Sequence, residues 1–250
     1  MFLPDYLSLL ILFGVGLIAG FINVNAGGGS TLTLPTLIFL GLDSALANGT
    51  NRIAIFIQNI SAVYSFKKEK YQQFDISLKL SLLTLPGSIV GALLAVHLSD
   101  AVFQKILGIV MIGIILSMII PQKKISYSGN NAKIPLSAYI AMFGIGFYGG
   151  FIQVGIGFIL MAALQRLMKL NLVYVNMHKV FIVLIYTIPV LLIFIFTNNV
   201  NWVFGIALAI GNATGAWWAA KFAVRKGEKI IKIILVVAVF IMSLKLLGVF

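Results

Sequence analysis

The chain is divided into long apolar runs, and this feature limits its fold more than any other. A helix needs about 20 apolar residues to cross the hydrocarbon core of a bilayer, and most of the longer runs approach or exceed this length. With 61% hydrophobic and only 10% charged residues, the chain also differs from soluble domains. We therefore expect an all-α integral membrane protein. The runs are Leu7–Asn23, Thr31–Leu42, Ala45–Phe66, Ile76–Leu98, Phe103–Ile120, Leu136–Gln153, Phe158–Met168, Leu172–Phe196, Trp202–Ala220 and Ile230–Leu247.

The series of runs starts again after the polar segment PQKKISYSGNNAK, which indicates an internal repeat. When Gly29 is placed on Gly157, Asn48 falls on Asn176 and Asn51 on Lys179, and after a small gap Gly87 and Gly91 fall on Gly211 and Gly215. We expect a first transmembrane repeat in residues 1–120, a cytoplasmic linker in residues 121–135 and a second transmembrane repeat in residues 136–250. Each repeat then has about four transmembrane helices.

Basic residues cluster in four segments and orient the chain in the membrane. Cytoplasmic loops carry an excess of Lys and Arg, so these segments are expected inside, whereas connections with Asp43, Asp100 or TNNVN are expected outside. This assignment requires the region Leu136–Leu170 to leave and re-enter the cytoplasmic side, and Leu7–Gly41 to do the same from outside. The repeats then have inverted topology, as in many transporters. The clusters are Lys67, Lys68 and Lys70; Lys123, Lys124 and Lys133; Arg166 and Lys169; and Lys221, Arg225, Lys226 and Lys229.

Three consecutive glycines interrupt the first apolar stretch, INVNAGGGSTLTLP. Broken backbone at membrane depth is tolerated only where it faces protein or a watery cavity, so Gly27, Gly28 and Gly29 are predicted to line an internal site. The helix that restarts at Ser30 or Thr31 directs its positive end into this site, where an anion can accept N–H groups, and Ser30 is the expected N-cap. In the second repeat QVGIGF offers Gly155 and Gly157 for the mirrored role. Helix packing is the alternative, and we prefer it for Gly14, Gly16, Gly20, Gly87, Gly91, Gly144 and Gly146.

A second group of polar residues lies about two turns into long apolar runs. ALANGTNR supplies Asn48, Thr50, Asn51 and Arg52, and VNMHKV supplies Asn176, His178 and Lys179. Amide and hydroxyl groups donate hydrogen bonds, and a guanidinium fork suits an oxoanion, so these residues are predicted to bind substrate or to line its path. The alternative is that Arg52 and Lys179 extend to the lipid headgroups.

The stretches AGGGSTLTLPTLIFLG and ANGTN resemble the glycine-rich first segment and the G-T-N element of the TauE/SafE family of sulfite exporter-like permeases. The two-repeat layout is similar over essentially the whole chain, although GIGFILMAAL and NMHK depart from the first-half pattern. The resemblance implies a multi-pass plasma membrane transporter of small anions, such as sulfite or sulfonates. We expect it to export them from a site near the midplane at the repeat interface; proton-coupled uptake is the alternative.

Other classes of function fit the residues less well. All six acidic residues fall in termini or connections, so no carboxylate pair lies at membrane depth for acid–base catalysis. With no Cys and two His, neither a metal site nor a cofactor is expected. The net charge of +12 lies in short clusters that orient the chain, so nucleic acid is not an expected partner. A membrane enzyme and a non-transporting scaffold remain alternatives, and a homo-oligomer is compatible with the sequence.

Overall fold

The structure of the chain, a computed structural model, describes residues 5–71, 73–119, 135–168, 170, 172–221 and 228–249. Every regular element within these residues is an α-helix. The helices are α1 (Asp5–Ala26), α2 (Ser30–Phe39), α3 (Ser44–Lys68), α4 (Phe74–His97), α5 (Asp100–Ile119), α6 (Leu136–Phe151), α7 (Ile156–Met168), α8 (Leu172–Phe196), α9 (Trp202–Lys221) and α10 (Glu228–Leu246). One helix corresponds to each predicted apolar run. Nearly all of the predicted linker, residues 121–135, lies outside the described residues.

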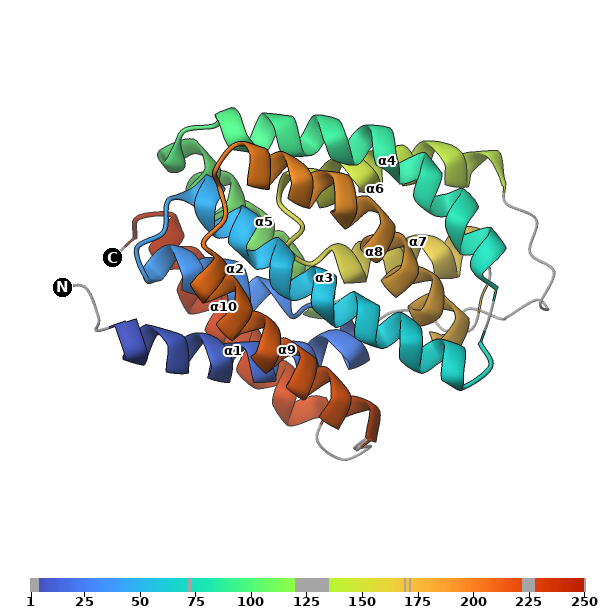
Figure 1. The fold of residues 1–250 in the computed structure, drawn as a ribbon, viewed down its shortest axis with the longest axis horizontal. Helices are drawn as coiled ribbons and strands as arrows, with labels where there is room; N and C mark the ends of the chain where they lie inside the picture. The colour runs from blue at the N-terminus through green and yellow to red at the C-terminus, as the bar shows by residue number, and fades with distance from the viewer. Residues whose placement is uncertain are drawn as a thin grey trace.

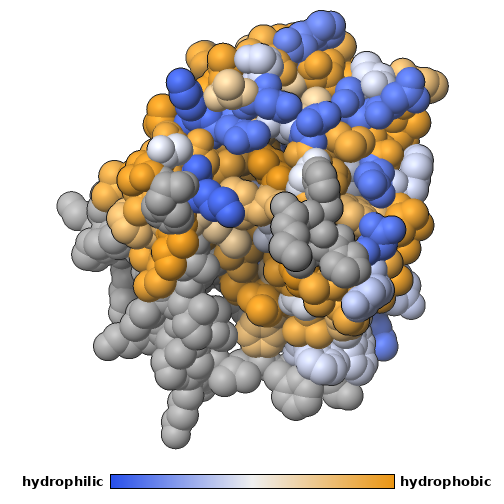
Figure 2. All heavy atoms as spheres, turned by 90° about the vertical axis from the view of Figure 1, so that its left-hand side faces the viewer, coloured by the Kyte–Doolittle hydropathy of each residue, from blue (hydrophilic) through white to orange (hydrophobic). Residues whose placement is uncertain are grey.

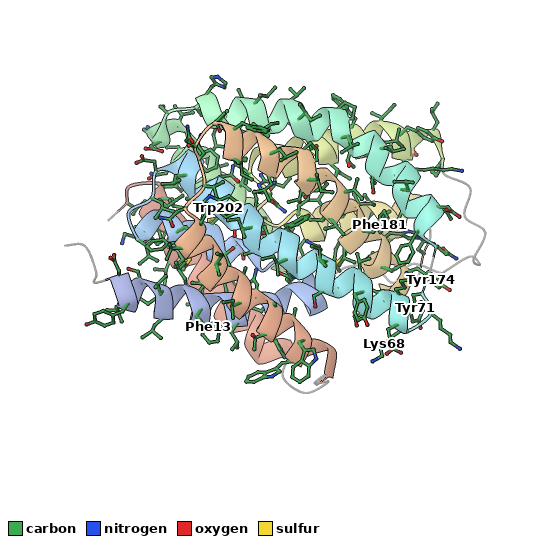
Figure 3. All side chains as sticks on the ribbon, in the orientation of Figure 1. Phe13, Lys68, Tyr71, Tyr174, Phe181 and Trp202 are labelled. Carbon is green, nitrogen blue, oxygen red and sulfur yellow. The ribbon has the colours of Figure 1, made fainter. Side chains whose placement is uncertain are left out.

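Four helices in the described part of the chain, α1, α4, α5 and α8, are long and apolar enough to cross a membrane. Large apolar side chains project outward from the bundle, including Phe13 of α1 and Trp202 of α9, which Figure 3 labels. Such an apolar outer surface is stable when lipid covers it. α3 is as long as α8 but carries many polar residues, and its first half is buried inside the bundle. The expected all-helical membrane protein is thus confirmed.

The polar connections lie at the two ends of this apolar bundle. Figure 2 shows the end of the bundle that holds the α2–α3, α4–α5 and α8–α9 connections. Hydrophilic residues lie there among hydrophobic ones. At this end the Ser44 N–H donates to the Asp100 carboxylate (2.6 Å) and the Asn201 N–H donates to the Thr50 hydroxyl (2.9 Å). The opposite end carries Lys68, and there the rings of Tyr71 and Tyr174 meet edge to face (Figure 3).

The helices α3 and α8 pack against each other in the centre and run in opposite directions (Figure 1). Gly49 near the start of α3 lies against Phe194 near the end of α8. At the other end Tyr71, which follows α3, contacts Tyr174 in the first turn of α8, with ring centroids 5.5 Å apart. This antiparallel pair forms the centre on which the shorter helices are arranged.

The first two helices of each half form a broken hairpin. In Figure 1 the chain begins at the left, α1 runs to the right, and α2 returns to the left, where α3 begins. The pair α6 and α7 starts from the right-hand end instead. The breaks separate Ala26 from Ser30 and Phe151 from Ile156. Each break therefore lies inside the molecule rather than at its polar ends.

Each hairpin packs against the other half through glycines. α1 lies on α9 and α6 lies on α4, and the contacts are equivalent in position. A Cβ on Gly20 would collide with the backbone of Asn212, and one on Gly150 with the backbone of Ser88. In the same way, a Cβ on Gly211 would collide with the carbonyl oxygen of Phe13, and one on Gly87 with that of Phe143.

Tight packing is thus confirmed for Gly16, Gly20, Gly87, Gly91 and Gly146. It is wrong for Gly14 and Gly144, where an added Cβ meets nothing within 4 Å.

Candidate functional site

The two helix breaks meet in the middle of the molecule. Gly27 adopts φ +81° and Gly155 φ +70°, conformations that disfavour residues with a Cβ. A Cβ on Gly27 would lie 3.0 Å from the Cα of Gly157, and one on Gly157 would collide with the Gly27 carbonyl oxygen. The breaks of the two halves therefore touch through their backbones. The N-termini of α2 and α7 converge here, as the sequence predicts.

Ser30 joins the two breaks, although it is not the helix cap that we expected. The N-cap of α2 is Gly29, with no side-chain capping hydrogen bond, and Ser30 is the first helical residue. Its hydroxyl instead donates to the Gln153 carbonyl and accepts from the Gly155 N–H, both at 3.3 Å. The backbone of Gly29 already has helical angles, φ −56° and ψ −36°, so the helix geometry begins one residue earlier than the expected cap position allows.

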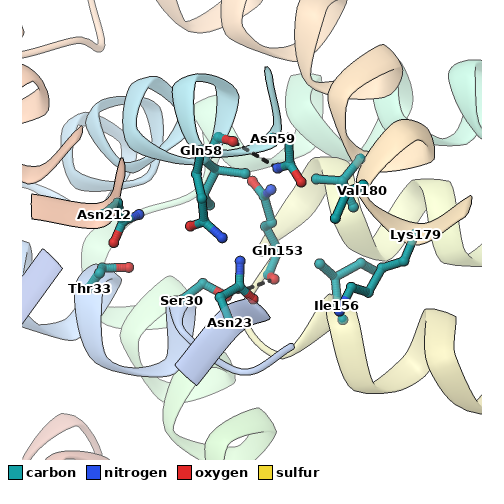
Figure 4. Close-up of a pocket in the computed structure, with 13 residues that line it drawn as sticks. Asn23, Ser30, Thr33, Gln58, Asn59, Gln153, Ile156, Lys179, Val180 and Asn212 are labelled. Atoms are coloured by element: carbon teal, nitrogen blue, oxygen red, sulfur yellow. Dashed lines mark hydrogen bonds between the residues drawn. The ribbon is translucent and has the colours of Figure 1, made fainter. Parts of the chain in front are cut away.

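A small cavity lies beside the two helix breaks (Figure 4). Its walls come from α1, α2, α3, α7, α8 and α9 and from the break between α6 and α7. Both halves of the chain contribute, and most of the side chains are polar. The lining residues are Asn23, Ser30, Thr33, Ile55, Gln58, Asn59, Gln153, Ile156, Gly157, Lys179, Val180, Val183 and Asn212. We call this space the central cavity.

Several polar atoms of the central cavity are buried without a partner among the described residues. They are the hydroxyl of Thr33, both amide atoms of Gln153 and the carbonyl oxygen of Asn212. These three side chains are at most 2% exposed. Figure 4 shows the Gln153 side chain between Asn59 and Ser30. A buried polar group without a hydrogen bond costs about 1–3 kcal/mol, so a polar ligand that supplies the missing partners would be stabilised here.

Lys179 is the charged residue of the central cavity. It is 4% exposed, and its ammonium group donates to the Asn176 carbonyl oxygen (2.7 Å) and contacts the Met161 sulfur (3.7 Å). An ammonium group has three donors, so these two contacts leave one for a ligand. No Asp or Glu is among the lining residues. The cavity therefore has a positive charge that an anion can balance.

Arg52 and Asn48 lie next to the second break but are not among the cavity-lining residues. The Arg52 guanidinium donates to the carbonyls of Gly149 (2.6 Å) and Gly150 (2.7 Å) and to the Asn48 side chain (3.1 Å). Arg52 is 0% exposed. Its alternative position at the lipid headgroups is therefore wrong, because protein encloses the whole side chain. The same alternative is wrong for Lys179.

The other predicted site residues occupy the neighbourhood of the breaks or the ends of the central helices. Gly28 packs on the Phe158 ring and Gly29 on the Ala19 carbonyl. Thr50 accepts a hydrogen bond from the α8–α9 connection, and Asn51 is buried without a partner among the described residues. His178 shares a 2.7 Å hydrogen bond with Ser77 of α4. Of the predicted residues, Ser30, Gly157 and Lys179 line the central cavity. A role in substrate binding stays a prediction for these three and for the rest.

Six polar lining residues were missed by the sequence analysis. Each is a polar side chain within or beside an apolar run, and that signal identifies all of them, because polar groups inside a membrane are costly and usually face the protein interior. Four of them stand in stretches already singled out as breaks or repeats. The missed residues are Asn23, Thr33, Gln58, Asn59, Gln153 and Asn212.

The described residues bring no group of three or more His, Asp or Glu side chains together. The expectation of a protein without metal or cofactor stays a prediction.

Comparison with known proteins places the chain among membrane transporters. The family model "Sulfite exporter TauE/SafE" matches residues 12–246. The chain is 32% identical over 249 residues to "Probable membrane transporter protein YfcA" of Escherichia coli K12, covering 99% of this chain and 92% of the relative. It is 30% identical over 245 residues to a "Probable membrane transporter protein" of Haemophilus influenzae, covering 95% and 94%. No solved structure was found to match.

Proposed function

The chain belongs to the sulfite exporter TauE/SafE family and is a multi-pass transporter of the plasma membrane, and from this premise we propose that it exports small anions. Sulfur oxoanions such as sulfite and sulfonates are the proposed substrates, and the central cavity is the proposed binding site. Catalysis is not part of this proposal, since the family and the relatives are transporters.

The observation that supports an anion best is the charge of the central cavity. Lys179 is buried there, and the lining includes no carboxylate. An unpaired charge in a dry site is costly, and a bound anion removes that cost. The hydroxyl group of Thr33 and the amide groups of Asn212 and Gln153 add the hydrogen-bond donors that oxoanion oxygens accept.

The proposed architecture is a pair of inverted repeats, residues 1–120 and 136–250. The equivalence of the α1–α9 and α6–α4 contacts supports it, as does the antiparallel packing of α3 and α8. The basic residues Lys67, Lys68 and Lys70 lie at one end of the bundle, which we propose as the cytoplasmic end. A site where two repeats meet is suited to alternating access, because one repeat can move against the other around it.

Export follows from the charge of the substrate. A negative cell interior drives an anion outward by about 2.3 kcal/mol per charge per 100 mV. An exporter therefore needs no coupling ion. We propose voltage-driven efflux, and uptake coupled to protons through His178 is the competing mechanism.

Replacement of Lys179 tests the proposed site. Lys179→Ala is expected to weaken sulfite binding by roughly ten- to a hundredfold, because a charge-assisted contact is worth about 1.5–3 kcal/mol. The measurement is sulfite efflux from proteoliposomes with an interior-negative potassium diffusion potential and equal pH on both sides. Lys79→Ala removes the same charge from an exposed position of α4 and serves as the control.

The native protein is expected to release sulfite faster as the interior becomes more negative. Efflux that ignores voltage, depends on a pH gradient and is lost in His178→Ala would favour the proton-coupled carrier. Equal affinities of the native protein and Lys179→Ala would exclude Lys179 as the anion's partner.

A further inference from the structure

The helix α6 ends inside the protein and leaves carbonyl groups without helical partners. The last four C=O groups of any α-helix lack an intrahelical donor, and at membrane depth no lipid group can supply one. In α6 these carbonyls belong to Tyr148, Gly149, Gly150 and Phe151. Their partners decide how firmly the second break is held.

Every one of these four carbonyls accepts a hydrogen bond. The backbone carbonyl oxygen of Tyr148 accepts hydrogen bonds from the backbone N–H groups of Ile152 (3.0 Å) and Gln153 (3.2 Å). Arg52 of α3 donates one guanidinium nitrogen to Gly149 (2.6 Å) and the other to Gly150 (2.7 Å). Asn48, one turn earlier on α3, donates its amide to Phe151 (2.7 Å). Two side chains from the first half therefore complete a helix end of the second half.

The electrostatics of this contact are favourable without an anion. The C-terminus of a helix carries partial negative charge, which stabilises a nearby cation. The Arg52 guanidinium also lies 5.7 Å from the centre of the Phe194 ring, within reach of a cation–π interaction. The Asn48 carbonyl oxygen accepts from Arg52 at 3.1 Å and so holds the guanidinium in place. Arg52 is thus oriented by α6, α8 and its own helix.

The chain leaves this helix end and immediately enters the central cavity. Two residues after Phe151, Gln153 adopts φ +64°, an unusual conformation for a residue with a Cβ, and its side chain lines the cavity. The Gln153 carbonyl accepts from Ser30 at the first break. The position and orientation of Gln153 therefore depend on where α6 ends.

We propose that Arg52 and Asn48 are positioning residues, which clamp the end of α6 so that Gln153 is presented to the substrate. The inference rests on the proposed function for its effect on transport, but the clamp itself does not. In the repeat alignment the residue equivalent to Arg52 is Val180, and the valine side chain has no hydrogen-bond donor for such a contact. The two breaks are therefore held differently, with the guanidinium clamp on the second.

Thiol labelling tests the clamp without any substrate, because the chain contains no cysteine. Gln153→Cys is labelled with a small methanethiosulfonate reagent in the native background and in the Arg52→Gln background. The labelling rate at position 153 is expected to rise severalfold when the clamp is removed. Asn212→Cys, which lines the cavity from α9, should label at the same rate in both backgrounds. Asn48→Ala deletes one of the three clamp contacts and is expected to give a smaller increase if Arg52→Gln does not fold.

A double-mutant cycle tests whether the clamp acts through Gln153. Arg52→Gln is expected to raise the KM for sulfite roughly three- to tenfold in the otherwise native protein, about the worth of a misplaced hydrogen bond. In the Gln153→Ala background the same change should raise KM less than about twofold, since coupled residues are not additive. In the Asn212→Ala background the full effect should remain.

The possible results separate the clamp from other roles of Arg52. Unchanged labelling at position 153 in both Arg52→Gln and Asn48→Ala would overturn the clamp. A full KM effect of Arg52→Gln in the Gln153→Ala background would instead indicate direct contact between Arg52 and the anion. A change in labelling without any sulfite transport would support the clamp and count against the proposed substrate.

Discussion

Arg52 and Lys179 are two buried cations with different surroundings. The Arg52 guanidinium faces the carbonyls of Gly149 and Gly150, so protein dipoles already stabilise its charge. Lys179 has a single amide oxygen and a sulfur as described partners and borders the central cavity. We therefore propose Lys179 as the cation that is left for a ligand. Residue type alone does not separate these two roles, because both are cations inside apolar helices.

Asn212 tests the contribution of an uncharged side chain to the proposed binding site. Its carbonyl oxygen is buried without a partner among the described residues, and its amide can donate to an oxoanion. Asn212→Ala is expected to weaken sulfite binding by roughly two- to tenfold, because a neutral hydrogen bond contributes about 0.5–1.5 kcal/mol. The measurement is the KM for sulfite efflux.

Thr214→Ala provides the matched control on the same helix. The Thr214 hydroxyl donates to the Ile210 carbonyl of α9 and lies outside the central cavity. Its replacement should leave the KM unchanged. If both variants bind sulfite as the native protein does, Asn212 is not a ligand of the anion.

The helices α1 and α6 need small residues on the faces that pack against α9 and α4. Gly20 faces the backbone of α9 and Gly150 faces that of α4, whereas Gly14 and Gly144 face open space on the same helices. Small residues let two helix backbones approach closely and bury apolar area. A larger residue at these positions would push the two helices apart. The helix pairs α1–α9 and α4–α6 are thereby held in equivalent ways.

Alanine substitutions are expected to distinguish the two faces. Gly20→Ala and Gly150→Ala should each lower the free energy of unfolding by about 1–3 kcal/mol or more, the typical cost of overpacking. Gly14→Ala and Gly144→Ala should leave stability unchanged or raise it by up to about 1 kcal/mol, since alanine favours the helix. Thermal unfolding in detergent measures all four. A loss of stability on one helix without the other would contradict their equivalent packing.

The two polar ends of the bundle differ in charge, and this asymmetry predicts the topology. Lys67, Lys68 and Lys70 stand at one end, and Asp43, Asp100 and the connection around Asn199 at the other. We expect Lys68 inside the cell, and Asn199 and both termini outside. Cysteines introduced singly at positions 5, 68 and 199 can be labelled with an impermeant reagent in intact cells.

Labelling from outside is expected for Asp5→Cys and Asn199→Cys but not for Lys68→Cys. The opposite pattern would mean that the chain has the reverse orientation, with the end that carries Lys68 outside the cell. Protection of Asp5→Cys together with labelling of Asn199→Cys would place those two positions on different sides and reject the proposed arrangement of inverted repeats.

The class of fold, the order of the helices and the position of both breaks follow from local sequence. Apolar runs of membrane length form helices in lipid, and the glycines Gly27–Gly29 and Gly155 interrupt these helices at their own positions in the sequence. These properties therefore need no contact between distant residues. The polar lining depends on tertiary packing instead. Arg52 meets Gly149, a residue 97 positions away, and Gln153 enters the cavity only because α6 ends there. Which buried polar group already has a partner, and which is left for a ligand, depends on helices that are far apart in the chain and meet only in the folded protein.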